Sequence, residues 1–411
     1  MTSSTGVSLG LVTYIALIFS MGALGIDGLL PALPQIATEL TPDAPNLAPL
    51  TVSIFVAGIG MGFIAGGPLT DRFGRKRMTL IGCGIYLSGA VSVIFAPQLE
   101  TVLIARALQG SGAAIAHVAI TGMVRDQFSG ARMAKIMSFA MMIFSLAPAV
   151  APLIGQFILK LGDWRLIFIA YSFYGALAIA ITYFARKETL LPENRRPISP
   201  TAIWGGVKES FSHDVFRRAI MLQTLCMGLV FASIANLQQI FEQAFDRGES
   251  FPRWFALIAL MVFLSSFLNG LLVEKLGPAR VIKTLLLVQS VNLVIGTTAI
   301  VLGGMGDTAL FVVFLLSILG VFMTPGLAAG NLNAIALVPL GHVAGTASSV
   351  IASISTLVGA MASIPVTLMF DGTPVPLMLT ATVTTLIAVF VSRKLTDPTS
   401  PAPLPVSGHT V

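Results

Sequence analysis

Residues 66–78 read GGPLTDRFGRKRM, and they place a short cluster of charge in a chain that otherwise carries little. Four of these residues are basic and one is acidic, namely Arg72, Arg75, Lys76, Arg77 and Asp71. An apolar run lies on each side, LTVSIFVAGIGMGFIA (50–65) before it and MTLIGCGIYLSGAVSVIFA (78–96) after it. A charged turn between two such runs is typical of a loop that joins two membrane-spanning helices.

The composition excludes a water-soluble protein. Hydrophobic residues make up 55% of the chain and charged residues 10%, whereas a soluble domain carries roughly 25% charge. A soluble fold cannot bury that much apolar surface, so we expect an integral membrane protein whose partner is the lipid bilayer. The basic residues lie in short loops between apolar runs, which argues against nucleic-acid binding. Cys83 and Cys226 lie inside apolar runs and predict neither a disulfide framework nor a metal site.

Apolar runs long enough to cross a bilayer recur along the whole chain. A span needs about 20 apolar residues, and the runs are continuous rather than alternating, which favours helices over a β-barrel. The sequence therefore predicts an all-α membrane protein with twelve transmembrane helices. We place them at 11–34, 48–69, 78–97, 102–124, 135–159, 165–185, 218–242, 254–273, 281–303, 309–330, 344–369 and 375–393.

The distribution of Lys and Arg predicts the orientation. With a cytoplasmic N-terminus, the predicted cytoplasmic segments hold 19 of the 24 basic residues and the outer segments hold four. Basic residues favour the cytoplasmic ends of spans, so both termini are expected in the cytoplasm. The longest charged segment, 186–217, divides the chain into two six-helix parts, 1–185 and 218–394, and a disordered cytoplasmic tail is expected at 395–411.

The two parts share a trace of internal repetition. Gly67, Asp71, Arg72, Gly74 and Arg77 recur at the same offsets, 203 residues later, as Gly270, Glu274, Lys275, Gly277 and Arg280. Each group follows the second span of its part, which indicates duplication. Twelve spans in two repeats are typical of a transporter with its binding site between the halves near the midplane.

The loop at 66–78 resembles the loop 2–3 motif of the major facilitator superfamily. Four further stretches resemble its twelve-span drug/proton antiporters, especially the Bcr/CflA branch: IDGLLPALPQIATEL (26–40), RALQGSGAA (106–114), LAPAVAPLIG (146–155) and DWRLIF (163–168). The resemblance implies the major facilitator fold and proton-coupled export. Phe63 and Gln156 depart from the pattern of that branch, so its substrate range does not carry over.

The loop itself allows two interpretations. One is topology alone, with Gly74 for the tight turn and the basic residues for cytoplasmic anchoring. The other is a conformational latch, in which Asp71 faces the positive N-terminal end of a helix in the other half. The resemblance makes that helix span eleven and implies that Arg75 or Arg77 pairs with Asp126. The latch residues are Gly67, Asp71, Arg72, Gly74, Arg75, Arg77 and Asp126.

Asp27 and Arg106 are the candidates for proton coupling, because ionisable residues at membrane depth are costly and functional. Both are expected in the outer half of the bilayer, at depths that could meet. A carboxyl group that moves between apolar surroundings and the vicinity of an arginine can bind and release a proton. The resemblance places Arg106 in the antiporter motif, consistent with this role. The alternative is a static buried ion pair that fixes helix packing.

Further polar residues extend along two spans and are candidates for substrate binding. Gln109 and His117 share a stripe with Arg106, and Asn236, Gln239 and Glu242 share a face of span seven. His117 is alternatively a neutral histidine hydrogen-bonded between helices, and Glu242 a solvated residue near the outer end. With 26 Phe and 17 Met in the chain, we expect a largely apolar cavity.

Two prolines and a glycine in span five form a separate signal. Pro148 and Pro152 each remove a helical hydrogen bond, and with Gly155 they predict a bend or a packing element. They match the antiporter motif of the resembled branch, although proline is also ordinary in membrane helices.

These observations predict a proton-coupled exporter of small, largely apolar molecules that works by alternating access. We expect a monomer in the bacterial inner membrane, with protons and a small-molecule substrate as partners. No cofactor and no enzymatic activity are expected, since neither a P-loop nor a nucleophile–base pair is present. One alternative is a proton symporter that imports a metabolite, and another is a membrane sensor that does not transport.

Overall fold

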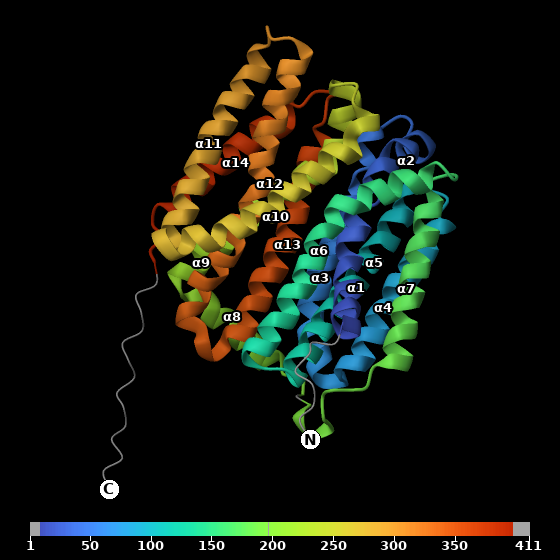
Figure 1. The fold of residues 1–411 in the computed structure, drawn as a ribbon, viewed down its shortest axis with the longest axis vertical. Helices are drawn as coiled ribbons and strands as arrows, with labels where there is room; N and C mark the ends of the chain where they lie inside the picture. The colour runs from blue at the N-terminus through green and yellow to red at the C-terminus, as the bar shows by residue number, and fades with distance from the viewer. Residues whose placement is uncertain (1–8, 196, 398–411) are drawn as a thin grey trace.

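The computed structural model describes residues 9–195 and 197–397. Within these ranges the regular structure is helical, and twelve helices have 18 residues or more (Figure 1). The twelve predicted spans are therefore confirmed. The long helices are α1 (Leu9–Asp27), α3 (Leu50–Phe73), α4 (Arg75–Ile94), α5 (Leu99–Gln127), α6 (Gly130–Leu159), α7 (Arg165–Ala185), α9 (Asp214–Gln239), α10 (Phe251–Leu276), α11 (Pro278–Leu302), α12 (Asp307–Leu337), α13 (Ala344–Leu368) and α14 (Val375–Ser392).

The described residues contain eleven separate helical runs that are apolar and long enough to cross a membrane. The number is eleven because a six-residue 3₁₀ segment, Val338–Val343, which is kinked at Leu340, joins α12 to α13 into one helical run. We call α1 and α3–α7 the first set, and α9–α14 the last set.

The first predicted span is wrong at its end. We expected one helix over 11–34, but α1 ends at Asp27 and is followed by a 3₁₀ helix, Leu30–Ala32, and by the short helix α2, Leu33–Leu40. Pro31 and Pro34 explain the break, since each lacks the N–H that would continue the helix and each lies near the start of a new one. Asp27 is therefore the last residue of its helix.

Two connecting segments contain structure that the apolar pattern does not predict. The predicted linker 186–217 contains a helix, α8 (Pro200–Ser212). The tail was expected to be disordered from residue 395, but Leu395 is buried and Asp397 accepts a hydrogen bond from the backbone of α11. Residues 398–411 of that predicted tail lie outside the described residues.

Tight glycine turns join equivalent helices in the two sets. Gly74 lies between α3 and α4 with φ of 98°, and Gly277 lies between α10 and α11 with φ of 79°. Residues with a side chain rarely adopt this left-handed region. The predicted turn at Gly74 is confirmed, and its counterpart in the internal repeat has the same conformation.

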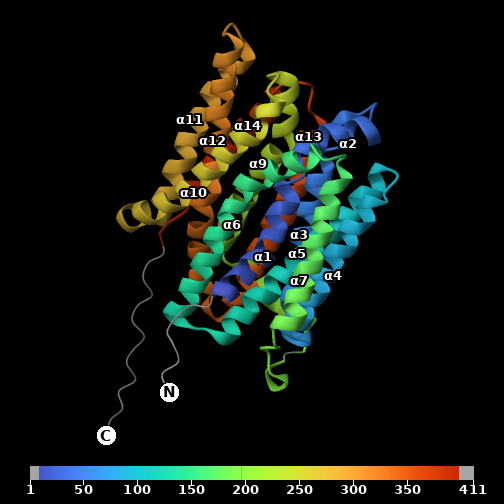
Figure 2. The ribbon, with the colours of Figure 1, turned by 45° about the vertical axis from the view of Figure 1, so that its right-hand side comes forward.

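The two ends of the bundle are packed differently. We call the end with the α3–α4 turn and the α7–α8 connection the linker end, and the end with α2 and the α9–α10 turn the far end (Figures 1 and 2). Toward the far end, one apolar cluster joins Leu30, Leu33 and Val52 to residues of the last set, including Phe251. At the linker end, all described members of the apolar cluster around Phe216 come from the part of the chain after residue 210.

Side-chain hydrogen bonds between the two sets follow the same pattern. Asn46 Nδ2 donates to the Leu368 carbonyl at 2.9 Å, and Gln156 Nε2 donates to the Glu249 carbonyl at 3.1 Å. The hydroxyls of Ser53 and Ser363 lie 3.0 Å apart, between α3 and α13. These groups lie toward the far end, so the described structure holds the two sets together there.

Candidate functional site

Arg106 is the centre of a buried polar network in the first set. It lies on α5, is completely buried, and donates to three acceptors. Nη2 reaches the Gly25 carbonyl of α1 at 2.6 Å, Nε reaches the Thr51 carbonyl of α3 at 3.1 Å, and Nη1 reaches Gln109 Oε1 at 2.7 Å. The guanidinium carbon lies 4.0 Å from the centre of the Phe55 ring. One planar group thus ties three helices together through charge-assisted hydrogen bonds.

Close helix packing brings these acceptors within reach. A Cβ at Gly25 would lie 2.4 Å from the Phe55 ring, and a Cβ at Gly110 would lie 2.0 Å from the Phe55 carbonyl oxygen. Glycine is therefore required at both positions for α1, α3 and α5 to approach. The sequence places arginine in α5 where the backbone carbonyls of two neighbours face it, and this arrangement satisfies a cation away from water.

Asp27 lies two residues after Gly25 and does not pair with Arg106. Its side chain is 4% exposed, and Oδ1 has no hydrogen-bond partner among the described residues. The ion pairs of the described residues do not include Asp27 or Arg106. The structure therefore places Asp27 two residues beyond the Gly25 carbonyl that Arg106 contacts, and it contradicts the static ion pair.

Helix α6 packs against the chain immediately after Asp27. A Cβ at Gly155 would lie 2.2 Å from the Gly28 carbonyl oxygen, and the Tyr171 hydroxyl donates to the Leu24 carbonyl at 2.6 Å. Helix α6 continues through Pro148 and Pro152. The sequence predicted either a bend or a packing element for Pro148, Pro152 and Gly155, and the structure shows close packing at Gly155.

Gln109 and His117 occupy different surroundings on α5. Gln109 is fully buried and holds Arg106, so in this conformation it does not line an open cavity as we expected. His117 is half-buried and stacks on Phe19, with ring centres 3.9 Å apart, while the Phe63 ring meets it edge-on at 5.8 Å. Phe63, which departs from the resembled branch, thus forms part of an aromatic cluster around His117.

The predicted polar face of α9 divides into two parts. Asn236 is buried, donates to Thr367 Oγ1 at 3.2 Å and accepts from Gln239 Nε2 at 2.8 Å. These contacts connect α9 to α13. Glu242 lies beyond the end of α9 in a π-helical turn, Ile240–Ala244, and is exposed at the far end. The solvated alternative for Glu242 agrees with this position.

The charged residues of the predicted loop lie in the last turn of α3 and the first turn of α4, on either side of Gly74, and Arg75 joins them. Its Nη1 contacts Asp71 Oδ1 at 2.6 Å, its Nε contacts Asp126 Oδ2 at 3.0 Å, and its side chain is nearly buried. Arg75 rather than Arg77 therefore pairs with Asp126. Arg72 and Arg77 lie instead over the Phe73 ring at 5.5 and 5.8 Å.

The expected contact between the loop and α13 is not formed in this conformation. The ion-pair partner of Asp71 among the described residues is Arg75 of its own loop. A Cβ at Gly67 would meet none of the described neighbouring atoms within 4 Å, so the space on that side of α3 is open in this conformation. A latch that closes this end would need the two sets to move together.

Glu188 is a partner of the loop that sequence reasoning missed. Its carboxylate accepts from the backbone N–H of Arg75 at 2.8 Å and of Lys76 at 3.1 Å, which satisfies the first turn of α4. Asp397 accepts likewise from Ala279 N at 2.7 Å at the start of α11. The signal was available: an Arg-Lys pair follows α7 and α14, and the first acid after each pair is the capping residue.

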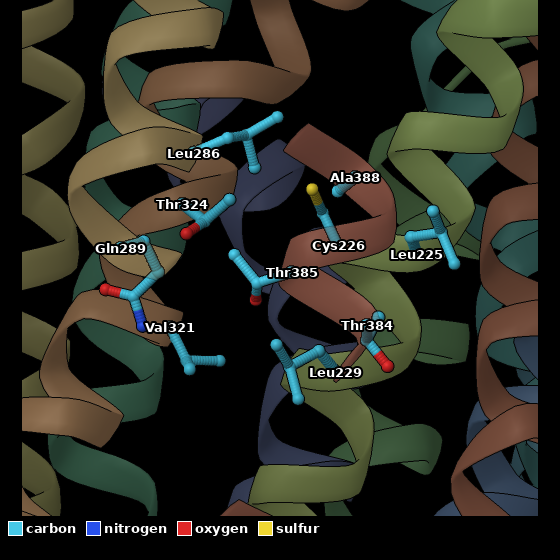
Figure 3. A pocket seen from close by; sticks show the side chains of 10 residues that line it. All are labelled: Leu225, Cys226, Leu229, Leu286, Gln289, Val321, Thr324, Thr384, Thr385 and Ala388. Carbon is cyan, nitrogen blue, oxygen red and sulfur yellow. The ribbon is translucent and has the colours of Figure 1, made fainter. Parts of the chain in front are cut away.

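A small cavity inside the last set does not fit a substrate. Its volume is about 10 Å³, and Gln289, Thr324 and Thr385 are among its lining residues (Figure 3). A space of this size holds about one water molecule. The polar groups around it serve helix packing, as Gln289 Nε2 donates to the Ser317 carbonyl at 3.2 Å.

Comparisons with known proteins agree on one family. The Major Facilitator Superfamily profile matches residues 14–363. The chain is 28% identical over 379 residues to a bicyclomycin resistance protein homolog of Haemophilus influenzae, covering 91% of this chain and 92% of the relative. It is also 28% identical over 253 residues to the multidrug resistance protein MdtL of Shewanella oneidensis, covering 61% and 63%. The crystal structure of a D-xylose-proton symporter superposes with a TM-score of 0.75 at 17% identity, covering 94% and 97%.

Proposed function

Because the chain belongs to the major facilitator superfamily, we propose that it is a proton-coupled exporter of small, largely apolar molecules. The two halves of the transporter are residues 1–185 and 218–394, connected by 186–217. The linker end faces the cytoplasm of a bacterial inner membrane, in agreement with the excess of Lys and Arg there. Both termini are then cytoplasmic.

The observation that carries the coupling proposal is the buried carboxyl group of Asp27. It lies at the end of α1, lacks a partner for Oδ1 among the described residues, and is two residues from the carbonyl that Arg106 holds. A carboxyl group that meets apolar surroundings in one state and water or a cation in another takes up and releases a proton. Asp27 is the proton carrier, and Arg106 holds the carbonyl of the adjoining segment of α1.

The distribution of contacts supports alternating access. The described side-chain hydrogen bonds between the two halves and the cluster that contains Leu30, Leu33 and Val52 lie toward the far end, whereas the described members of the Phe216 cluster all follow residue 210. Such an arrangement corresponds to a state closed to the outside. Transport then requires the far end to separate and the linker end to close, with the loop at 66–78 as a latch that stabilises the closed cytoplasmic side.

The relatives and the aromatic cluster support an apolar substrate. The relatives are named for resistance to bicyclomycin and to multiple drugs. The half-buried Phe63 and His117 rings, which meet edge-on beside the buried Phe19, offer aromatic surface on which a flat apolar compound can pack. Asn236 and Gln239 supply polar groups on the opposite half. The chain is a drug or metabolite exporter rather than an enzyme.

The experiment that tests this proposal compares two Asp→Asn variants in proteoliposomes with an imposed pH gradient and a panel of candidate drugs. Asp27→Asn should abolish uphill transport while the protein remains folded. Asp43→Asn removes an exposed carboxylate near the same end and should transport like the unmodified protein. Gradient-driven accumulation by Asp27→Asn at the unmodified rate would overturn the assignment of the carrier. The direction of coupled movement distinguishes export from import.

A further inference from the structure

A second cavity lies at the far end, on the seam between the two sets. Its volume is about 300 Å³, within the range of pockets that hold small organic molecules. One side comes from α2 and the residues that follow it, up to the start of α3, and the other side comes from the end of α9 and its π-helical turn. The cavity therefore exists only while these two parts of the molecule lie together.

The two walls differ in chemistry. The first wall carries four prolines, Pro34, Pro42, Pro45 and Pro49, which present rigid apolar surface without backbone N–H donors. The second wall carries three glutamines and Glu242. Among the described residues that line the cavity there is no lysine, arginine or histidine, and the carboxylate of Glu242 is the single charged group.

The second wall also has an acceptor that the described structure leaves unused. Gln238 is 5% exposed, and its Oε1 has no hydrogen-bond partner among the described residues. A buried acceptor without a partner costs free energy that a donor-bearing ligand would recover. Glu242 is exposed, has the Gln238 side chain as a hydrogen-bond partner, and belongs to none of the described ion pairs, so its negative charge has no cation beside it among the described residues.

We propose that this seam cavity binds small organic ammonium compounds from the far end, and that binding holds the two sets together. The ammonium group contacts Glu242 and donates to Gln238 Oε1, while the apolar body packs on the prolines. A bound compound makes contacts with both sets, so it favours the state with the far end closed. Binding of the ammonium compound does not depend on the proposed function. An effect of the bound compound on transport rests on that function, because the far end must open during the proposed cycle.

The binding half is tested by calorimetry on the purified full chain, with benzylamine as the probe and benzyl alcohol as its neutral counterpart. Benzylamine should bind at least tenfold more tightly than benzyl alcohol. Glu242→Gln should weaken benzylamine binding by at least tenfold. Thr38→Trp, which fills the cavity from its exposed rim, should abolish binding without any change of charge.

The matched control for charge is Glu100→Gln, an exposed glutamate at the start of α5. It should change benzylamine binding by less than twofold. Equal affinity for benzylamine and benzyl alcohol, or undiminished binding by Glu242→Gln or Thr38→Trp, would overturn the proposed site. These outcomes do not bear on proton-coupled export, because no transport is measured.

The closing half is tested by disulfide formation between Ser53→Cys and Ser363→Cys, whose hydroxyls lie 3.0 Å apart across the seam. In a background without Cys83 and Cys226, saturating benzylamine should raise the rate of cross-linking at least threefold. Benzylamine should have no such effect when Thr38→Trp is added. An unchanged rate in the cysteine pair, at a benzylamine concentration that saturates the calorimetric site, would show that the ligand does not hold the sets together.

Discussion

At the scale of single residues, Arg106 shows why an arginine, and not only a positive charge, is needed in α5. Its donors reach carbonyls on α1 and α3 and an amide on α5 itself, in three directions. The sequence predicted a buried Arg106 near Asp27, because charge inside an apolar run is conspicuous. It could not predict the acceptors, because a backbone carbonyl that faces a neighbour leaves no residue-specific signal.

Arg106→Lys should therefore damage both stability and transport. A single ammonium cannot reach the Gly25 and Thr51 carbonyls and Gln109 together, and each hydrogen bond to a charged group contributes about 1.5–3 kcal/mol. We expect a loss of several kcal/mol in stability and at least a tenfold lower rate of uphill transport. Thermal unfolding and proteoliposome assays measure these effects.

The control for Arg106→Lys is Arg253→Lys, at an exposed position on α10. It should leave both properties unchanged. If Arg106→Lys unfolds at the same temperature as the unmodified protein, the three hydrogen bonds do not contribute to stability as described.

Gly155→Ala tests the close contact between α6 and the end of α1. The new Cβ would lie 2.2 Å from the Gly28 carbonyl oxygen, so the two segments must move apart. Overpacking of this kind costs about 1–3 kcal/mol, and we expect a lower thermal midpoint. Gly84→Ala serves as the control, because a Cβ there meets no atom within 4 Å. Equal midpoints for the two variants would contradict the required contact.

At the scale of helices and loops, the sequence predicted correctly those features that depend on neighbouring residues in the chain. Apolar length predicted the twelve spans, and the repeated glycine predicted the turn at Gly74. The end of α1 was misplaced because the apolar pattern continues through Pro31 and Pro34 although the helix does not. The capping role of Glu188 was missed because it depends on a contact with Arg75, 113 residues away.

Glu188→Gln tests this cap. The amide retains one acceptor oxygen but loses the charge that faces the N-terminal end of α4, and caps of this kind contribute about 0.5–2 kcal/mol. We expect faster amide hydrogen exchange at Arg75 and Lys76, the two donors. Glu193→Gln, an exposed neighbour in the same connection, should leave that exchange unchanged. Full protection of α4 in Glu188→Gln would exclude the cap.

At the scale of the whole molecule, the far end and the linker end have opposite roles in the transport cycle that we propose. Asp71 lies beside Arg75 in the present conformation and is free of α13, since its described ion-pair partner is in its own loop. Its proposed contact with α13 would form only after the linker end closes. A residue that acts in one state of the cycle should affect rates more than affinity.

Asp71→Asn should accordingly slow transport several-fold and leave substrate affinity within a few-fold. The loop lies at the linker end, far along α3 from the contact between Ser53 and Ser363. Initial rates and equilibrium binding of the same substrate separate the two effects. A large loss of affinity with a normal maximal rate would show that Asp71 acts on the binding site instead of the latch.

The paired carboxylates also have a mechanical consequence. Glu188 ties the chain that leaves α7 back to α4, and Asp397 ties the chain that leaves α14 back to α11. The first contact closes the segment from α4 to α7 into a loop, and the second closes the segment from α11 to α14. A pulling force applied to the α8 connection, or through a domain fused after Asp397, would first load these caps. The transmembrane helices would bear that load only after the caps had broken. The two carboxylates therefore protect the helices from a force applied to the chain at the linker end.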